Sequence, residues 1–189
     1  SVCDPPLVRS VTPGTVPPSS RRLAPMPAAV VRRPGEETMA TRVDTAAVAP
    51  ADRKGYWAEA SARMFVPLEF EPAPRRPFSG WMQGGPLADV QLCELAATPH
   101  VVARTPRLAD TGDGAYFKLN LVVEGQMIVR QDGRETLIGA GDFTICDCAR
   151  PYAIETRTPL RLLICMLPQE ALSITPERMA RITATSVPC

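Results

Sequence analysis

The chain has 189 residues, of which 45% are hydrophobic and 22% are charged, and its formal net charge is +1. This composition is typical of a globular protein with one substantial core, and it excludes binding to nucleic acid through an overall positive charge. Arginine outnumbers lysine 19 to 2, but the arginines are scattered among Asp and Glu and form no basic segment.

The cysteines and the hydrophobic runs indicate the compartment. Six cysteines would suggest disulfides in a small secreted protein, but four of them, Cys93, Cys146, Cys148 and Cys165, fall within apolar, strand-like runs. We therefore predict that they are buried, reduced thiols that pack as small hydrophobic side chains. No stretch approaches the roughly 18 consecutive apolar residues of a membrane span. We expect a cytoplasmic protein that does not contact a membrane.

Residues 1–38 differ in composition from the rest of the chain. They contain 8 of the 21 prolines and no aromatic residue, and no hydrophobic period runs through them. Such a segment cannot bury enough apolar surface to offset the entropy of ordering, which predicts disorder. Because Met39 opens a stretch of more ordinary composition, our hypothesis is that the natural chain starts there.

Residues 39–86 are expected to form one helix and then a connection rich in proline and glycine. Trp57 and Met64 lie on one face at helical spacing, and Asp52 is placed to cap the helix start. The prolines that follow end the helix. The segment Gly80–Pro86 is predicted to be a loop, and it lacks the Gly-Lys-Ser/Thr of a phosphate-binding loop.

From residue 87 to residue 168, apolar residues recur at every second position, which predicts strands. About seven short strands are typical of a β-sandwich or a β-barrel. Asp132-Gly133 lies between two such runs and predicts a hairpin, because both turn residues must tolerate a positive φ. The alternation places six residues on the inner face of the barrel: Phe117, Leu119, Leu121, Val129, Ile145 and Ile154.

Residues 169–189 are predicted to be a helical tail. Thr175 is a favourable N-cap residue, and it is followed by Pro176 at the first helical position. Met179 and Ile182 lie three residues apart on the apolar side of this helix. Because the sequence ends a few residues later, we expect a truncated tail with little to pack against.

Several short motifs follow one another in the β-rich region. An apolar strand ends in Gly125, a hairpin turns at Asp132-Gly133, a turn follows at Gly141-Asp142, and Asp-x-x-Arg-Pro-Tyr occupies residues 147–152. In this order and spacing, the motifs resemble the N-terminal, ligand-binding domain of AraC-type transcriptional regulators. The resemblance covers residues 57–182.

The resemblance implies a mainly β fold, a cupin-like β-barrel of the double-stranded β-helix or jelly-roll type, with a preceding helix and short C-terminal helices. It also implies a domain that senses a small organic effector and dimerises, as a homodimer or as a heterodimer with a full-length relative. In the family, two helix-turn-helix units follow the barrel, and this sequence shows none. We therefore expect no direct binding of nucleic acid by this chain, and no cofactor.

Few residues in the chain suit metal or redox chemistry. A metal-dependent cupin needs several histidines and a carboxylate, whereas His100 is the only histidine, and we expect it to have a structural role at an edge or in the core. Cys146 and Cys148 lie two apart in a strand-like run, which favours two small apolar side chains on one face over a metal or redox pair.

Two carboxyl residues in the predicted turns could in principle work as an acid–base pair. We expect structural roles for both: Asp142 would accept backbone N–H groups in its turn, and Asp147 would fix the following corner through Arg150. Tyr152 and Trp57 are the aromatic residues best suited to contact a ligand, although packing is their default role.

Two further functions remain open besides the regulator domain. One is a stand-alone cupin-fold protein that binds small molecules, and the other is a metal-free cupin enzyme. The enzyme would need a polar, ionisable interior, whereas the inner positions predicted above are mostly apolar. We therefore predict a non-enzymatic domain without catalytic or metal-binding residues, and the sequence does not identify its ligand-binding residues.

Overall fold

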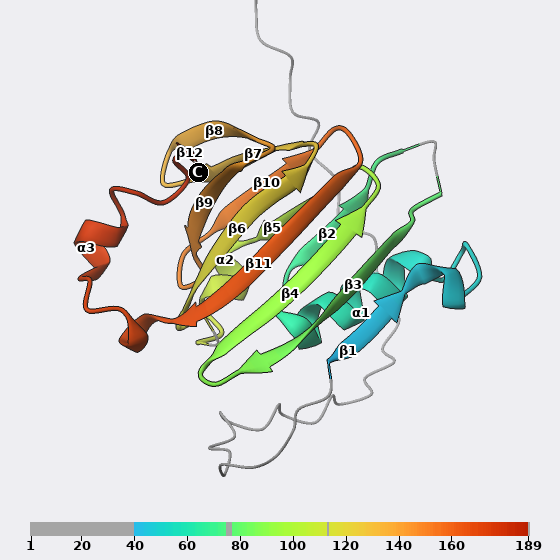
Figure 1. Cartoon of the computed structure of the whole chain (residues 1–189), viewed down its shortest axis with the longest axis horizontal. Coiled ribbons are helices and arrows are strands. Elements are labelled where there is room, and N and C mark those ends of the chain that lie inside the picture. The colour runs from blue at the N-terminus through green and yellow to red at the C-terminus, as the bar shows by residue number, and fades with distance from the viewer. Residues whose placement is uncertain (1–39, 75–76, 113, 189) are drawn as a thin grey trace, which may run out of the picture. The chain divides into compact units, whose positions relative to one another are not determined.

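The computed structural model describes residues 40–74, 77–112 and 114–188 (Figure 1). The predicted disorder of residues 1–38 and the proposed start at Met39 therefore lie outside the described residues. The helical elements within these ranges are short apart from the first α-helix: η1 (Thr45–Ala47), α1 (Arg53–Met64), α2 (Pro106–Ala109), η2 (Gln169–Ala171) and α3 (Pro176–Met179). None of the described helices is long and apolar enough to cross a membrane.

The strands form two antiparallel sheets. The first sheet has the order β1-β3-β4-β11-β6-β9-β12, from Thr41–Asp44 (β1), Gly80–Leu87 (β3), Val90–Ala97 (β4), Leu160–Pro168 (β11), Tyr116–Glu124 (β6), Asp142–Asp147 (β9) and Val187–Pro188 (β12). The second sheet has the order β2-β5-β10-β7-β8, from Glu69–Pro72 (β2), His100–Arg104 (β5), Tyr152–Thr156 (β10), Gln126–Gln131 (β7) and Arg134–Gly139 (β8). The buried hydrophobic core draws on both sheets.

This architecture confirms the predicted mainly β, cupin-like fold, but the two sheets are not closed into a barrel. In the part of the chain that the structure describes, no strand ladder joins one sheet to the other. The edge strands explain this: β12 has two residues and includes Pro188, and β2 ends at Pro72. A proline cannot donate a ladder hydrogen bond, so these edges do not continue the sheet.

The predicted hairpin at Asp132-Gly133 is confirmed. Asp132 has φ 52° and Gly133 has φ 75°, and Gln131 pairs with Arg134 across the turn between β7 and β8. Two positive φ angles match the twist of the flanking strands, which is why Asp-Gly is favoured here.

The predicted loop Gly80–Pro86 is wrong, because these residues form most of β3. Met82 of β3 is fully buried, and the strand pairs with both β1 and β4. Gly84 lies opposite Cys93, and a Cβ at Gly84 would come within 2.1 Å of the Leu92 carbonyl oxygen. Glycine is therefore needed at position 84 for the close approach of the two backbones. Because glycine is also typical of loops, the sequence pattern predicted a loop where the chain forms a strand. The sheets consequently begin well before residue 87, with β1, β2 and β3.

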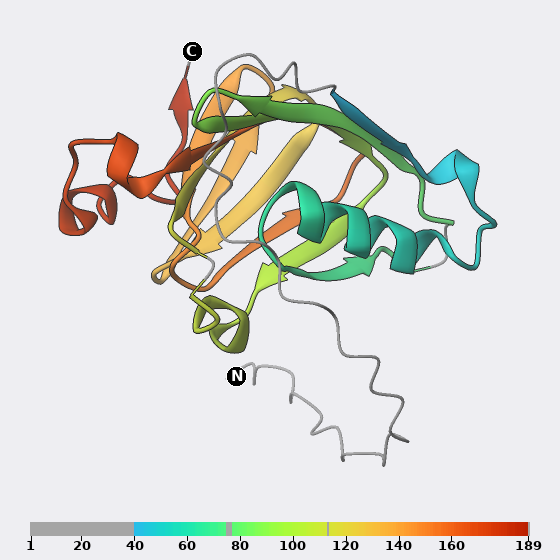
Figure 2. The same ribbon diagram turned by 90° about the horizontal axis from the view of Figure 1, so that it is seen from below.

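The predicted helix with a tryptophan anchor is confirmed as α1. Trp57 is 2% exposed, and its ring lies 5.2 Å from that of Phe78 in an edge-to-face arrangement. Asp52 occupies the N-cap position but makes no side-chain capping bond, so that part of the prediction is wrong. Figure 2 shows α1 beside the two sheets, where it contacts β2, an edge strand of the second sheet, and β3, the second strand of the first sheet.

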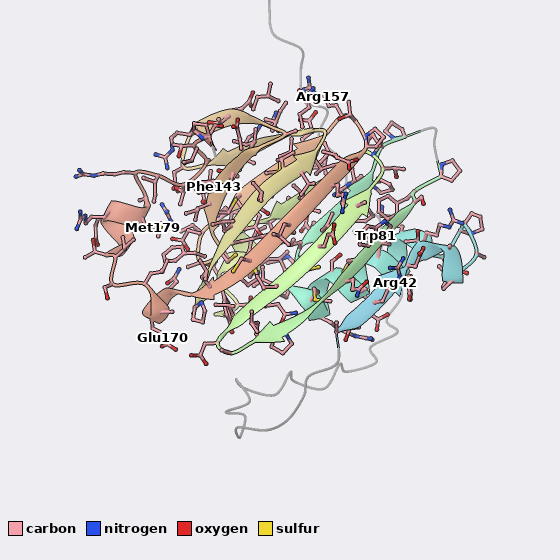
Figure 3. All side chains as sticks on the ribbon, viewed as in Figure 1. Arg42, Trp81, Phe143, Arg157, Glu170 and Met179 are labelled. Carbon is pink, nitrogen blue, oxygen red and sulfur yellow. The ribbon has the colours of Figure 1, made fainter. Side chains whose placement is uncertain are left out.

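The tail is helical only in part, and it packs against the sheets rather than lacking a partner. Thr175 caps α3 as predicted, since its Oγ1 accepts from the backbone N–H of Arg178 at 3.4 Å. Met179, labelled in Figure 3, is 1% exposed. Beyond it, Thr183 forms a bridge to Ile145, and Arg134 donates to the Thr183 carbonyl oxygen at 2.9 Å. These contacts bring β12 back onto the first sheet.

The predicted inner face is correct for Val129 and Ile154, which belong to the hydrophobic core. Phe117 is buried but lies outside this core cluster, and Leu119, Leu121 and Ile145 are half-buried. In β6 the buried residues at alternate positions are Lys118, Asn120 and Val122. The inward phase of β6 is therefore the opposite of the one predicted, and Leu119 and Leu121 lie on the outer face.

We expect Gly84→Ala to lower the free energy of unfolding by about 1–3 kcal/mol, because the added methyl group must displace backbone atoms of β4. Gly139→Ala is the matched control: its Cβ would meet nothing within 4 Å, and its effect should stay within about 0.5 kcal/mol. Denaturant unfolding of both variants measures the difference. Equal effects would contradict the close approach of β3 and β4.

Candidate functional site

The space between the two sheets is polar at one end. On the inner face of the first sheet, cross-strand pairing aligns Cys146 of β9, Lys118 of β6, Met166 of β11 and Gln91 of β4 in one row. The next row contains Thr144, Asn120, Ile164 and Cys93. Beyond these two rows the inner face is apolar, with Val122, Leu162, Leu95 and Met82. Polar side chains thus gather at one end of an otherwise hydrophobic interior.

Lys118 is the unusual residue in this group. Its side chain is buried, with 4% of the residue exposed, and its Nζ lies 5.0 Å from the centre of the Phe65 ring, just beyond the end of α1. Within the described ranges, no hydrogen bond or ion pair holds this nitrogen. Burial lowers the pKa of Lys118, because the charged form loses its hydration. The face of an aromatic ring offsets only part of that loss.

Three cysteines surround Lys118 without neutralising it. Burial raises the pKa of the thiols of Cys93 and Cys148 to about 11 and that of Cys146 to about 12. All three thiols are therefore protonated and uncharged at neutral pH. As predicted, Cys93, Cys146 and Cys148 are buried and free of disulfides, and they pack as small side chains. Cys165 is also free, but it is half-buried rather than buried as predicted.

Two neighbouring polar atoms also lack partners. Asn120 and Thr144 face each other across β6 and β9, and both residues are fully buried. The amide nitrogen of Asn120 donates to the Lys118 carbonyl oxygen at 3.2 Å, but Asn120 Oδ1 and Thr144 Oγ1 make no hydrogen bond among the described residues. A buried polar atom without a partner lowers the stability of the fold by about 1–3 kcal/mol. The Asn120 side-chain carbonyl oxygen and the Thr144 hydroxyl both carry this cost, and both can still form a hydrogen bond.

The second sheet completes the polar end. Arg104, Tyr152 and Gln131 lie in one row across β5, β10 and β7, and all three are buried. Arg104 donates from Nε to the Cys148 carbonyl oxygen at 2.7 Å, and the Tyr152 hydroxyl lies 4.0 Å from Cys148 Sγ. Burial raises the pKa of Tyr152, which keeps its phenol neutral. Cys148 thus connects this row to the surroundings of Lys118.

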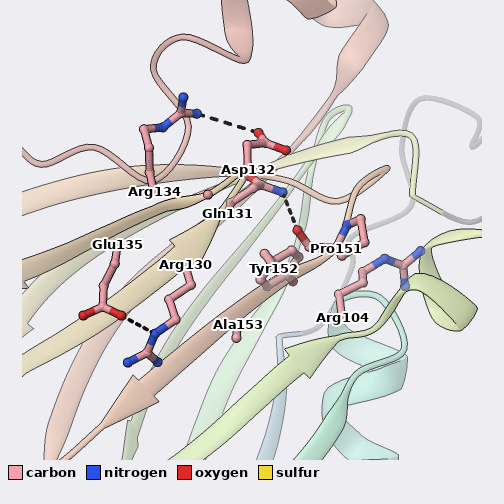
Figure 4. A pocket seen from close by; sticks show the side chains of 10 residues that line it. Arg104, Arg130, Gln131, Asp132, Arg134, Glu135, Pro151, Tyr152 and Ala153 are labelled. Carbon is pink, nitrogen blue, oxygen red and sulfur yellow. Dashed lines mark hydrogen bonds and ion pairs between the residues drawn. The ribbon is translucent and has the colours of Figure 1, made fainter. Parts of the chain in front are cut away.

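A hollow of about 480 Å³ opens at the same end of the second sheet (Figure 4). It is lined by Arg104, Arg130, Gln131, Asp132, Gly133, Arg134, Glu135, Pro151, Tyr152 and Ala153. The charges on its rim are paired: Arg130 bonds Glu135 and Glu155, and Asp132 lies 2.5 Å from Arg150. Tyr152, which we singled out from the sequence, therefore contacts both this hollow and the interior.

The only acidic side chain among the buried polar residues of the described ranges is Asp147, and it is fully engaged. Its carboxylate accepts from Arg150 Nε at 3.0 Å, from Gln169 Nε2 at 2.8 Å and from the Ala149 backbone N–H at 2.9 Å. This confirms the predicted corner, and it leaves Lys118 without a buried counter-ion in the described part of the chain.

The two candidate carboxylates do not come together. Asp142 and Asp147 occupy opposite ends of β9, about 16 Å apart at the usual rise of a strand. Asp142 accepts a hydrogen bond from Ser186 Oγ at 2.9 Å. An acid–base pair is therefore ruled out. In addition, no group of three or more His, Cys, Asp or Glu side chains suited to a metal ion occurs among the described residues.

His100 has the structural role that we expected, in the core. It is 7% exposed, it lies against the rings of Phe70 and Phe78, and its Nδ1 lies 2.8 Å from the Thr98 carbonyl oxygen. Burial is the main cause that lowers its pKa, so the imidazole is held neutral.

The sequence did not identify Lys118, Asn120 and Thr144 as site residues. The available signal was that a lysine and an asparagine interrupt the apolar run of β6 at alternate positions. Because the leucines of β6 were assigned to the interior, the polar residues were assigned to solvent. Thr144 gave no signal, since threonine is common in strands.

Two antiparallel sheets that enclose a partly polar interior define a cupin-like domain. The chain belongs to the AraC-binding-like domain family, whose model matches residues 57–187. This match confirms the family resemblance drawn from the sequence motifs.

Relatives of the chain include regulators. The chain is 31% identical over 146 residues to an uncharacterized protein in the nit 5′ region of Bacillus sp. (strain OxB-1), covering 77% of the chain and 57% of that protein. It is 31% identical over 118 residues to the transcriptional activator NphR of Rhodococcus sp., covering 62% of the chain and 35% of the activator. The chain therefore spans little more than half of the first relative and about a third of the second.

Among solved structures, the AraC-like transcriptional activator CuxR has the same fold. The TM-score is 0.63 at 17% sequence identity, and the match covers 71% of this chain and 49% of CuxR. At this identity, the likeness supports the fold assignment alone.

We expect the stability of the protein to fall as the pH is lowered below about 6.5. The unfolded chain takes up a proton at His100 near that pH, whereas the folded protein does not until a lower pH, so acid favours unfolding. Each pKa unit is worth about 1.4 kcal/mol. Unfolding measured from pH 7.5 to 5.5 in the wild type and in His100→Gln isolates this effect. Parallel pH profiles would contradict the buried, neutral imidazole.

Lys118→Met should raise the free energy of unfolding at pH 7 by about 1–3 kcal/mol, because it replaces an unpaired buried amine by an apolar side chain of similar length. The gain should shrink as the pH rises toward 10.5, since the unfolded state then no longer binds the extra proton that destabilises the wild type. Lys54→Met is the control, because Lys54 is exposed and pairs only with Glu71 among the described residues. Destabilisation by Lys118→Met would contradict this account.

Proposed function

We propose that the chain is the effector-sensing domain of an AraC-type transcriptional regulator and that its effector binds at the polar end of the interior. The observation that carries the proposal is the group formed by Lys118, Asn120 and Thr144. Asn120 Oδ1 and Thr144 Oγ1 are buried atoms without a hydrogen-bond partner among the described residues, and Lys118 is a buried residue whose amine makes no hydrogen bond or ion pair in that part of the chain. Such atoms lower stability, and in native proteins departures of this kind are expected at functional sites. Membership of the AraC-binding-like family supports the regulatory assignment.

We propose binding rather than catalysis at this site. The buried thiols and the phenol hold their protons at neutral pH, and the buried carboxylate of Asp147 is occupied by Arg150 and Gln169. General acid–base work needs a group that exchanges protons near the working pH and reaches the substrate. This weighs against the metal-free enzyme, which we considered as an alternative.

A response to the effector can be transmitted through α1. The ring of Phe65 lies over Lys118, and Met64 Sδ accepts from Gln91 Nε2 at 2.9 Å. A thioether and an aromatic face are weak partners for an amide and an amine, so a ligand with better acceptors would displace them. We propose that this displacement shifts the end of α1 and so changes the relative populations of two conformations of the domain, which differ in the position of this helix.

DNA recognition is proposed to belong to sequence other than the described residues. A helix-turn-helix unit needs two helices joined by a short turn. In the described ranges, α1, α2 and α3 are separated from one another by strands, and α2 and α3 have four residues each.

We also propose that the domain pairs with a second copy through the outer face of the first sheet. Figure 1 looks onto this face, and no described helix crosses it. Pairing places apolar residues side by side in its centre: Leu92, Leu119, Leu121, Phe143, Ile145, Leu163 and Cys165. Leu163 is 41% exposed. A two-fold contact requires a surface complementary to itself, which an uncharged apolar patch provides. A heterodimer with a full-length relative would use the same face.

Thermal unfolding of the full chain in the presence of single compounds tests effector binding. The panel contains small organic acids, their amides, simple sugars, and Zn²⁺, Ni²⁺ and Mn²⁺ as separate arms. At about 100 times its dissociation constant, a ligand stabilises the fold by about 2.7 kcal/mol, which corresponds to a rise of roughly 5–11 °C in the unfolding midpoint. We expect at least one organic compound, and no metal ion, to produce such a rise.

The same samples separate binding from catalysis. A stabilising compound should be recovered chemically unchanged after long incubation. Conversion of the compound, stabilisation by a metal ion alone, or a panel without any stabilising organic compound would each count against the proposed function.

A further inference from the structure

Lys118 lies between the sheets without a buried acid to pair with it, and this indicates the chemical class of the effector. Arg104, the other buried cationic side chain in the described ranges, donates to the carbonyl oxygens of Cys148 and Pro67, and Asp147 is the buried acid. Asp147 is engaged by Arg150, so it does not compensate Lys118. The groups that act most strongly on Lys118 besides its burial are the thiols of Cys146, Cys148 and Cys93, which are uncharged at neutral pH. A negative charge on a bound ligand would stabilise the ammonium form of Lys118, which burial alone disfavours.

We propose that the effector is a small monocarboxylate whose carboxylate pairs with the ammonium group of Lys118. This inference rests on the proposed function and assigns the ligand class of the same site. One buried amine is neutralised by one negative charge, whereas a dianion would leave an uncompensated charge between the sheets. A carboxylate also pairs strongly with a lysine ammonium group, because the hydrogen bond between them is charge-assisted.

The surroundings of Lys118 define the rest of the ligand. Thr144 Oγ1 can donate to a carboxylate oxygen, while Asn120 Oδ1 is an acceptor and needs a donor such as a hydroxyl or an amide N–H. Most of the other residues in these two rows are apolar or nearly so: Met166, Ile164, Cys93 and Cys146. The exception is Gln91, whose amide nitrogen donates to Met64 Sδ. The effector is thus an acid with an apolar body and one hydrogen-bond donor.

The chain offers an unusually simple test, because Lys118 and Lys54 are its only lysines. Full-length protein made with [¹³Cε]-lysine gives two side-chain resonances, one from the interior and one from the exposed residue on α1. The probes are benzoate, 4-hydroxybenzoate and hexanoate, each compared with its primary amide, which has similar shape but no charge. Binding is followed by NMR at neutral pH, and the pKa of each lysine is measured with and without the acid.

We expect at least one acid to shift the Lys118 resonance with saturation and to raise the pKa of Lys118, while the Lys54 resonance stays in place. The corresponding amide should bind at least 10-fold more weakly. In Lys118→Met, which we expect to fold more stably than the wild type, affinity for the acid should fall at least 10-fold. Lys54→Met should bind like the wild type.

Three results would overturn the monocarboxylate assignment: equal binding of an acid and its amide, undiminished binding by Lys118→Met, or no shift of the Lys118 resonance with any acid of the panel. If an amide or another neutral compound binds between the sheets, the assignment fails while effector sensing stands. If no organic compound binds at all, the proposed function fails with it.

Discussion

Successive side chains of a strand point to opposite faces, so the inward placement of Val122 on β6 also places Asn120 and Lys118 between the sheets. A shift of one residue would bring Leu119 and Leu121 inside and remove the buried amine. The observed phase is held by neighbours on both sides: β6 pairs with β9 in a continuous register, and with β11 in a register that shifts once, between Arg161 and Leu162. The position of the polar group therefore follows from sheet pairing and not from an affinity of Lys118 for its surroundings.

The polar side chains of the interior differ in how many of their hydrogen-bonding atoms have partners. Gln131 is a structural polar residue: its amide donates to the Asp147 carbonyl oxygen at 2.8 Å and accepts from the Asp147 N–H at 2.9 Å, which fixes the corner before β10. Lys118, Asn120 and Thr144 have no such role. This contrast separates Gln131, whose hydrogen bonds hold the fold, from the unpaired atoms of Asn120 and Thr144, which belong to the binding site that we propose.

Local chemistry made much of the fold predictable, whereas the site depended on information that the sequence pattern lacks. The hairpin at Asp132-Gly133 was predictable because the two residues suit a turn with two positive φ angles, and the helix around Trp57 because its apolar residues recur at helical spacing. The phase of β6 was not, because its outer face is also apolar: Leu119 and Leu121 belong to the patch that we propose as a dimer contact. Alternation identifies the more apolar face, and only pairing with β9 and β11 shows which face is inside. The strand β3 was not predicted because it contains glycines, of which Gly84 is required by the close approach of the β4 backbone.

The central claim is that Lys118 lies inside the domain, and the reactivity of the two lysine amines tests it most directly. Native protein is treated briefly with formaldehyde and a mild reductant, and methylation is located by peptide mass spectrometry. The account predicts that Lys54, whose side chain is 52% exposed, is methylated, and that Lys118 is modified only after unfolding. Methylation of both lysines at similar rates in the folded protein would contradict it.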